Sequence, residues 1–340
     1  MVQIHSPRLF QTLVATVNHF KFSLLALFVA ATILTSGCSQ QPSSPTNRTV
    51  PHQEDWGIYA LELATQDIEL VWSTSQAISY LCLNHDGDEF AFSCRISGTA
   101  DSDEEIFNIG IDGTGLRQLT DNDYWDLYPC FSPDDSRIAF LSMRDSTLDI
   151  YSLNSDGGNE TKLYDSGFHD ADISWGSSGW IAFTRNSQVW VMEEDGTDAR
   201  PLTSPPRAGE WGKANLPFGD YDPRFSPDSS RIAFERMDAD DSPHGNYNIY
   251  VIDSNGSGET KLTNSGYSQG LVTWSHSGDR MVYIVAAIGT AGKYDIYLMN
   301  SDGSNIQNVT PDYFPPSFLC HSAMFSQDDS KIYFTGQWYK

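Results

Sequence analysis

The chain has 340 residues, of which 45 are acidic and 20 are basic, and its formal net charge is −25. Glycine, serine and aromatic residues are plentiful, which suits many short strands joined by tight turns. A surface this acidic repels phosphate backbones, so we expect no binding to nucleic acid. Cations and basic protein patches are the partners that such a charge favours.

Residues 1–37 are predicted to be a lipoprotein signal peptide. An apolar run, Phe22–Thr35, follows Arg8 and Lys21, and it is shorter than the ~20 residues that a membrane span needs. The run leads into LTSGC, which resembles the lipobox of bacterial lipoproteins. In that family the peptide is cut before the cysteine, whose thiol then receives a diacylglycerol, so the resemblance makes Cys38 the lipidated residue. The alternative is an uncleaved N-terminal anchor helix.

Residues 38–55 contain this cysteine and a predicted flexible tether, because the segment is polar, rich in proline and without an apolar run. Under either interpretation of the N-terminus, the domain that follows is expected to be exported and tethered to the membrane. Two acyl chains give stable anchoring where one is marginal. We therefore expect a lipid-anchored protein of the cell envelope, at the periplasmic face of the outer membrane or on the outer cell surface.

From residue 56 to residue 340 the chain repeats one short phrase. Phe131–Phe140 reads FSPDDSRIAF, and Phe225–Phe234 reads FSPDSSRIAF. Looser copies begin at Leu83, Trp175, Trp274 and Phe325. A period of about 40–50 residues is typical of propeller blades. After each copy comes a strand–turn–strand phrase with Asp-Gly or a related glycine turn, which is a strong hairpin signal.

These copies predict an all-β fold: a six-bladed β-propeller with four antiparallel strands in each blade. Six copies of the first hairpin are present, but only five copies of the second hairpin follow them. The missing hairpin matches Ile58–Trp72, which has the same strand–turn–strand pattern. The last blade is therefore predicted to be closed by these N-terminal strands, so that the ring has no open edge. In the turns, Asp134, Asp228 and Asp328 are predicted to accept backbone N–H bonds.

The phrases SPDxSRIAF, DIYx(L/M)NSDG and LT together resemble the TolB-type, WD-like propeller repeat over about residues 56–340. TolB proteins carry an α/β domain before the propeller, whereas here we expect only the tether. The resemblance implies a monomeric, non-enzymatic module that binds a protein or peptide, or acts as a scaffold, in the cell envelope. A fold by itself does not establish a function.

A tunnel-mouth binding site is predicted where the chain enters the first strand of each blade. Two equivalent positions carry carboxylates in blades two to four, with two histidines nearby. The predicted residues are Asp126, Asp170, Asp172, Asp220, Asp222, His169 and His321. Converging like charges raise each other's pKa unless a cation joins them, so the site is expected to bind Ca²⁺ or a partner's basic side chain. The alternative is a hydrated acidic funnel.

The insertion Ser204–Tyr221 lengthens the connection between blades three and four and carries Trp211 and Phe218. Exposed aromatic residues on a long loop suggest contact with a partner. The equally good alternative is a loop that folds back and caps the tunnel.

An enzyme is the second functional hypothesis: a carbohydrate-active or hydrolytic enzyme that uses the acids at the tunnel mouth. Gly266–Gly270 reads GYSQG and matches the GxSxG nucleophile pattern. That pattern needs a strand before it and a helix after it, whereas here strands flank both sides, so we interpret the match as chance.

Four cysteines lie in the predicted propeller: Cys82, Cys94, Cys130 and Cys320. Cys82 and Cys94 lie on the two strands of one hairpin, while Cys82 and Cys130 occupy equivalent positions in neighbouring blades. The sequence leaves their pairing open, and buried free thiols are the alternative to disulfides.

Overall fold

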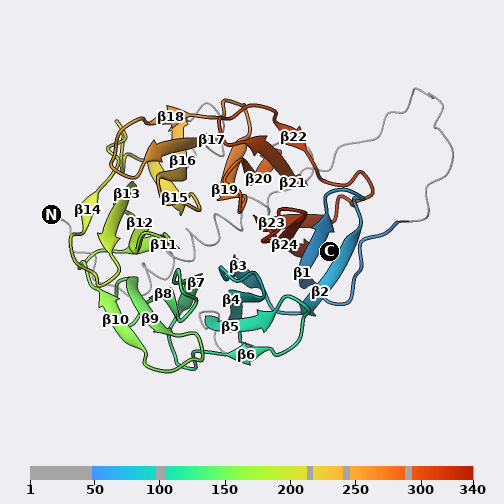
Figure 1. Ribbon diagram of the computed structural model, residues 1–340, viewed down its shortest axis with the longest axis horizontal. Coiled ribbons are helices and arrows are strands. Elements are labelled where there is room, and N and C mark those ends of the chain that lie inside the picture. The colour runs from blue at the N-terminus through green and yellow to red at the C-terminus, as the bar shows by residue number, and fades with distance from the viewer. Residues whose placement is uncertain (1–47, 97–103, 213–216, 240–245, 288–292, 340) are drawn as a thin grey trace. The chain divides into compact units, whose positions relative to one another are not determined.

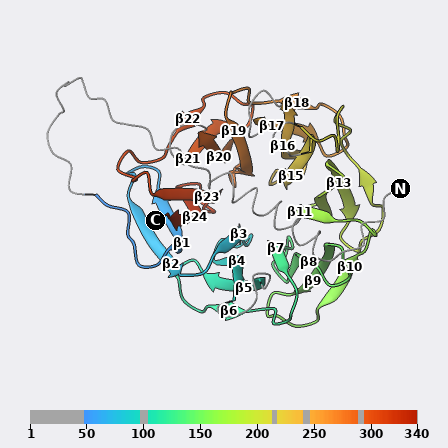
Figure 2. The same ribbon diagram turned by 180° about the vertical axis from the view of Figure 1, so that it is seen from behind.

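The computed structural model describes residues 48–96, 104–212, 217–239, 246–287 and 293–339. In these residues all regular secondary structure is β, and the strands form six four-stranded antiparallel sheets. The sheets stand around a ring as the blades of a propeller, which both views show (Figures 1 and 2). None of the described residues forms a helix long and apolar enough to cross a bilayer.

In blades 1 to 5 the strands run from the tunnel outward in chain order. Blades 1 and 2 consist of β3 (Ile78–Leu83), β4 (Glu89–Arg95), β5 (Glu104–Gly110) and β6 (Arg117–Gln118), then β7 (Asp126–Phe131), β8 (Arg137–Ser142), β9 (Asp149–Asn154) and β10 (Thr161–Tyr164). Blades 3 and 4 consist of β11 (Asp170–Trp175), β12 (Trp180–Arg185), β13 (Gln188–Glu193) and β14 (Arg200–Pro201), then β15 (Gly219–Phe225), β16 (Arg231–Ala239), β17 (Asn246–Asp253) and β18 (Thr260–Lys261). Blade 5 consists of β19 (Ser268–Trp274), β20 (Arg280–Ala287), β21 (Lys293–Asn300) and β22 (Gln307–Asn308).

The sixth blade joins the two ends of the described chain in one sheet. Its inner strands are β23 (Phe318–Phe325) and β24 (Lys331–Trp338), and its outer strands are β1 (Trp56–Glu62) and β2 (Ile68–Thr74). β1 pairs with β24 along its whole length, and the N–H of Trp338 donates to the carbonyl of Asp55 at 2.7 Å. The predicted six-bladed fold and its closure by N-terminal strands are confirmed. Packing against this blade begins at Val50, which is buried in its core and lies within the segment predicted as tether.

The apolar residues of the repeated phrase make the core between blades. The aromatic residue at the same place in the second strand is fully buried in all six blades: Phe92, Phe140, Phe183, Phe234, Tyr283 and Phe334. Full burial of one such side chain contributes about 1.5–3 kcal/mol. The glycine turns dock on the preceding blade: Gly113 has a φ of 77°, and a Cβ there would lie 2.2 Å from the carbonyl oxygen of Val71. The glycine therefore allows both the turn and the close approach of two blades.

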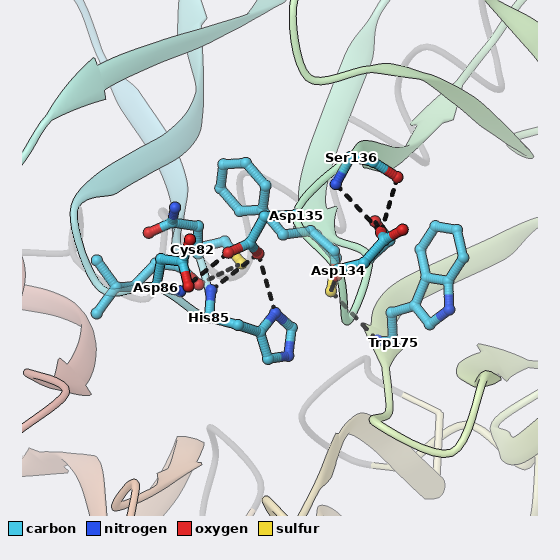
Figure 3. A network of polar contacts seen from close by, with 12 residues as sticks. Cys82, His85, Asp86, Asp134, Asp135, Ser136 and Trp175 are labelled. Atoms are coloured by element: carbon cyan, nitrogen blue, oxygen red, sulfur yellow. Dashed lines mark hydrogen bonds and ion pairs between the residues drawn. The ribbon is translucent and has the colours of Figure 1, made fainter.

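The aspartate of the phrase holds the turn between the first and second strands, as predicted. The Asp134 carboxylate accepts hydrogen bonds from the hydroxyls of Ser132 and Ser136, both at 2.7 Å, and from the N–H of Ser136 (Figure 3). These bonds, that from Ser132 first, lower the pKa of Asp134 to about 2. Asp328 has the same bonds and the same lowered pKa. Each of these aspartates is therefore a turn residue.

The next position explains the single difference between the two nearly identical phrases. Asp135 has a φ of 56°, and its carboxylate accepts the backbone N–H groups of His85 and Asp86 in blade 1, both at 2.9 Å (Figure 3). In blade 4 the same position is Ser229, whose hydroxyl accepts the N–H of Ser178 in blade 3 at 3.2 Å. The residue that varies between the phrases therefore links each of these turns to the blade before it.

Each innermost strand also carries a β-bulge about halfway along. At each bulge one residue adopts a positive φ, between 41° and 63°: Tyr80, Tyr128, Asp172, Asp222, Leu271 and Ser322. A left-handed conformation costs a non-glycine residue about 1–2 kcal/mol. A bulge re-aims the side chain that it carries, and all six blades keep it, so the tunnel wall is shaped by side chains placed in this way.

Candidate functional site

Three of the predicted tunnel-mouth acids are paired with arginines inside their own blades. Asp170 contacts Arg185 with 2.7 Å between Oδ1 and Nε, and Asp220 contacts Arg236 through both carboxylate oxygens. Asp126 lies 3.3 Å from Arg144. The three carboxylates are fully buried. A carboxylate that already has an arginine partner is a poor receptor for a second cation, so these three residues offer little to the Ca²⁺ or basic side chain expected at the site.

The surroundings of Arg185 show how completely such a pair is enclosed. Its guanidinium lies 4.5–5.0 Å from the ring centroids of Tyr164, Phe183 and Trp190, and only 5% of the side chain is exposed. Burial raises the pKa of Asp170 to about 6, against the opposing effect of Arg185. The pair therefore fixes the second strand of blade 3 to the start of its first strand.

The other two acids, Asp172 and Asp222, lie at the bulges of their strands and form polar contacts inside the tunnel. Tyr80 of blade 1 donates its hydroxyl to Asp222 of blade 4, the opposite blade, at 3.1 Å. Arg224 contacts the same carboxylate oxygen at 2.8 Å and lies 5.0 Å from the Tyr80 ring centroid. Asp172 accepts the N–H of Asp222 at 3.3 Å. The hydrogen bond from Tyr80 to Asp222 crosses the tunnel, and these contacts bring together only two of the five predicted carboxylates.

A cavity of about 270 Å³ lies beyond these contacts, at the end of the tunnel where the innermost strands finish in their tight turns. We call this side of the ring the turn face, and the opposite side, where each innermost strand begins, the entry face. The cavity is lined by the innermost strands and turns of all six blades, and Tyr80 and Arg224 are among the lining residues. Burial lowers the pKa of Arg224 to about 10, so it stays protonated at neutral pH. The sequence prediction placed the site at the other end.

The two predicted histidines do not join the acids. The ring of His169 accepts the N–H of Leu148 at 2.9 Å through Nδ1. His321 is buried in blade 6, with its ring centroid 5.5 Å from those of Trp56 and Tyr294. Burial lowers the pKa of both histidines to about 4. Both rings are therefore neutral at physiological pH, and the contacts described are with other residues of the fold.

This lowered pKa predicts a loss of stability in acid. Histidines in an unfolded chain titrate near pH 6.5, so below that pH the unfolded state binds more protons than the folded state. The stabilisation by neutral His321 is complete above pH 6.5 and falls as the pH approaches 4, by up to about 3 kcal/mol. We expect His321→Phe to flatten the dependence of the unfolding free energy on pH over this range. Denaturant unfolding at several pH values would measure it.

The matched control is His276→Gln, which replaces an exposed histidine and is measured over the same pH range. Equal pH dependence in the wild type and in His321→Phe would contradict the assignment.

The two aromatic residues of the predicted partner loop differ in their exposure. Trp211 is 55% exposed and pairs with Pro217 in an isolated bridge. Phe218 is wrong as a contact residue, because it is 1% exposed and packs against Met237. Arg207 lies over its ring at 3.6 Å, so the loop folds back on this aromatic side chain instead of presenting it.

The exposed aromatic side chains gather on the entry face. Of the seven exposed large hydrophobic residues in the described chain, five are aromatic residues of entry-face segments: Tyr124, Phe168, Trp211, Tyr267 and Tyr339. The first four belong to consecutive connections that lead into blades 2, 3, 4 and 5. Leu116 and Ile306, the other two, lie in turn-face hairpins. We call the five residues the aromatic arc.

The aromatic arc lies among acidic side chains. Asp121 and Asp123 are exposed beside Tyr124. Asp165 beside Phe168 and Glu210 beside Trp211 are also exposed, but they form ion pairs with Lys162 and Arg207. Aromatic residues are enriched in protein interfaces, whereas single exposed apolar residues are ordinary. A row of them over consecutive blades, with carboxylates between, matches a partner that carries both apolar and basic groups.

The four cysteines of the propeller are free thiols. Cys82 pairs with Ala91 and Cys94 pairs with Ile78, so the register separates Cys82 from Cys94 along their hairpin. The lipidation residue Cys38 lies outside the described residues. Within the described ranges, no three or more His, Cys, Asp or Glu side chains are arranged to hold a metal ion.

Comparison with known proteins supports the resemblance to TolB-type propellers. The chain is 28% identical over 162 residues to a "Protein TolB homolog" of Chlorobium luteolum, a match that covers 46% of this chain and 33% of the homologue. It is 26% identical over 215 residues to an uncharacterized protein of Agrobacterium fabrum, covering 59% of this chain and 68% of that protein. The solved structure of a putative TolB from Agrobacterium tumefaciens superposes with a TM-score of 0.64 at 17% identity, covering 84% and 99% of the two chains. No protein-family model matches the chain.

Apart from Trp211, the aromatic arc was missed although the sequence contains a signal for it. An aromatic residue stands two positions before Asp126, Asp170, Asp220 and Gln269: Tyr124, Phe168, Phe218 and Tyr267. The periodicity marks these connections, but only the structure separates the three exposed rings from the buried Phe218. The partners of the buried acids also had a signal, since Arg185 and Arg236 each lie two residues after the buried phenylalanine of their phrase.

Proposed function

We propose that this TolB-like propeller is a lipid-anchored, exported protein of the cell envelope that binds a protein or peptide on its entry face, without catalysis. The observation that carries the proposal is the aromatic arc. Its rings supply apolar contact area with little loss of side-chain freedom, as expected of residues that dominate binding energy at interfaces. The surrounding carboxylates favour basic residues in the partner and increase its rate of association.

Ca²⁺ is the weaker choice of ligand for the predicted acidic site. Three of the five carboxylates are already paired with arginines, and Asp222 is paired with Arg224. A basic side chain near the exposed acids of the entry face needs no change in these internal pairs. We therefore propose the partner's basic groups as the counter-charge, and the membrane contact through Cys38 as the second attachment.

The proposal predicts that entry-face variants lose a partner that turn-face variants keep. Phe168→Ala combined with Trp211→Ala should reduce recovery of the bound protein from envelope extract by at least tenfold, because hot-spot aromatic residues each contribute about 2 kcal/mol or more. The control is Leu116→Ala combined with Ile306→Ala, which removes equally exposed apolar side chains from the other face. Quantitative pull-down of the same protein with all three baits measures the effect.

Two outcomes would contradict the proposed face or the proposed chemistry. Equal losses in both double variants would show that the aromatic arc has no special role. Binding that does not weaken with salt would exclude the electrostatic contribution, because attraction between exposed charges is screened beyond about 8–10 Å at physiological ionic strength.

A further inference from the structure

Two cysteines of the propeller occupy one wall of the turn-face cavity. Cys82 is on β3 and Cys130 is on β7, at the position just before the leading residue of each phrase. β3 and β7 are innermost strands of neighbouring blades and pack against each other. Both residues line the cavity, and neither is fully buried. Figure 3 shows Cys82 beside the turn of Asp135.

The structural role of this position does not require a thiol. The Trp175 N–H of blade 3 donates to Cys130 Sγ at 3.2 Å (Figure 3). One blade further on, the Phe225 N–H donates in the same way to the Ser174 hydroxyl at 3.1 Å. A serine therefore serves as the acceptor between blades in this protein. The hydrogen bond therefore does not explain why this position is cysteine in two adjacent blades. What cysteine adds, and serine lacks, is the ability to form a disulfide.

The two thiols are unequal. The neighbouring Cys130 thiol lowers the pKa of the Cys82 thiol, and the interaction with Cys82, together with burial, raises the pKa of Cys130. A thiolate is the nucleophile in disulfide exchange, so Cys82 is the attacking group and Cys130 the resolving group.

The remaining propeller cysteines differ from this pair. Burial raises the pKa of Cys94 to about 12 and also raises the pKa of Cys320. Both are buried and lie outside the cavity lining. They therefore serve as internal controls that should remain unmodified in the folded protein.

We propose that Cys82 and Cys130 are an oxidation site, and that they form a disulfide between blades 1 and 2 when the protein meets a disulfide-bearing oxidant. The Cys82 thiolate attacks one sulfur of the oxidant, forms a mixed disulfide and releases the first thiol. Cys130 then loses its proton to solvent and attacks the Cys82 sulfur, which releases the second thiol. The two protein thiols are oxidised by two electrons, and the oxidant's disulfide is reduced to two thiols.

The bond would tie two neighbouring blades and close a loop as long as one repeat. A cross-link of this kind stabilises mainly by restricting the unfolded chain, so the melting temperature should rise on oxidation. The inference does not depend on the entry-face partner, because the pair lies on the opposite face of the ring.

The test is oxidation of the reduced full-length chain with oxidised glutathione, followed by digestion without reductant and mass spectrometry. We expect one cross-linked species that joins the peptides of Cys82 and Cys130, with Cys94 and Cys320 alkylated only after unfolding. Separate glutathione adducts on Cys82 and Cys130, or two reduced thiols after prolonged oxidation, would overturn the proposal.

Single serine variants distinguish attack from resolution. Cys130→Ser should stop the reaction at a glutathione adduct on Cys82, whereas Cys82→Ser should form an adduct on Cys130 several-fold more slowly. Ser174 shows that serine fits the acceptor position, so both variants should fold, and their melting curves check this. Equal adduct rates in the two folded variants would remove the assigned roles, and an absent cross-link in the wild type would remove the site.

Discussion

Replacing Asp170 by alanine is expected to lower the free energy of unfolding by about 3–5 kcal/mol. The carboxylate is fully buried, and its partner Arg185 is 5% exposed, with its Nε 2.7 Å from Asp170 Oδ1. Removal of the acid leaves a buried guanidinium among Tyr164, Phe183 and Trp190 without its counter-charge. Denaturant unfolding of the wild type and Asp170→Ala measures the loss.

Two comparisons make this prediction specific. Asp156→Ala removes an exposed turn carboxylate that accepts the Gly158 N–H at 2.9 Å, and should cost only about 0.5–1.5 kcal/mol. Replacing both partners, as Asp170→Leu with Arg185→Met, should recover most of the stability, because an apolar pair of similar volume needs no counter-charge. If Asp170→Ala lowered the free energy of unfolding no more than Asp156→Ala does, the buried ion pair would make no special contribution to stability.

Truncating Tyr59 to alanine is expected to loosen the closing blade and to cost about 3–5 kcal/mol. The side chain is completely buried, and its ring lies 5.1 Å from that of Phe318 and 5.6 Å from that of Phe334. Its hydroxyl donates to the carbonyl of Pro51 at 3.1 Å and accepts from the Trp338 indole at 3.2 Å. One residue thus joins the N-terminal strands to both C-terminal strands.

The matched variant Tyr59→Phe keeps the ring and loses only the two hydrogen bonds. We expect this loss to lower the free energy of unfolding by about 1–3 kcal/mol. Limited proteolysis supplies an independent measurement: in Tyr59→Ala, cleavage should begin in β1 and β2, because their attachment to β24 is the contact that has been weakened. Unfolding free energies that are equal in Tyr59→Ala and Tyr59→Phe would show that the ring contributes nothing to closure.

The fold was predictable because its information is local and repeated. The phrase FSPDDSRIAF contains the end of one strand, a turn and the next strand, and its copies count the blades. Closure was predictable because only Ile58–Trp72 was left to complete the last blade. Two of the bulge residues, Asp172 and Asp222, are among the predicted site residues, although the sequence does not reveal their positive φ.

The site was less predictable because its contacts join residues that no local pattern relates. The bond between Tyr80 and Asp222 connects opposite blades, so its existence depends on the width of the tunnel. Five carboxylates counted as one group in the sequence, yet Arg144, Arg185 and Arg236 divide them. Likewise Trp211 and Phe218 are alike in sequence, and only the path of the loop makes one exposed and the other buried.

Because the first and last strands of the propeller share the sixth blade, the six blades form a closed cycle. The propeller could therefore begin at another connection between strands. β24 finishes and β1 begins on the same face, and the bond from Trp338 to Asp55 already bridges them as in an uncut hairpin. A circularly permuted chain, with these ends joined and new ends placed between β2 and β3, would keep all the strand pairings. Its sixth blade would then be a continuous segment like the other five, and closure would rest on packing between complete blades instead of on a sheet shared by both termini.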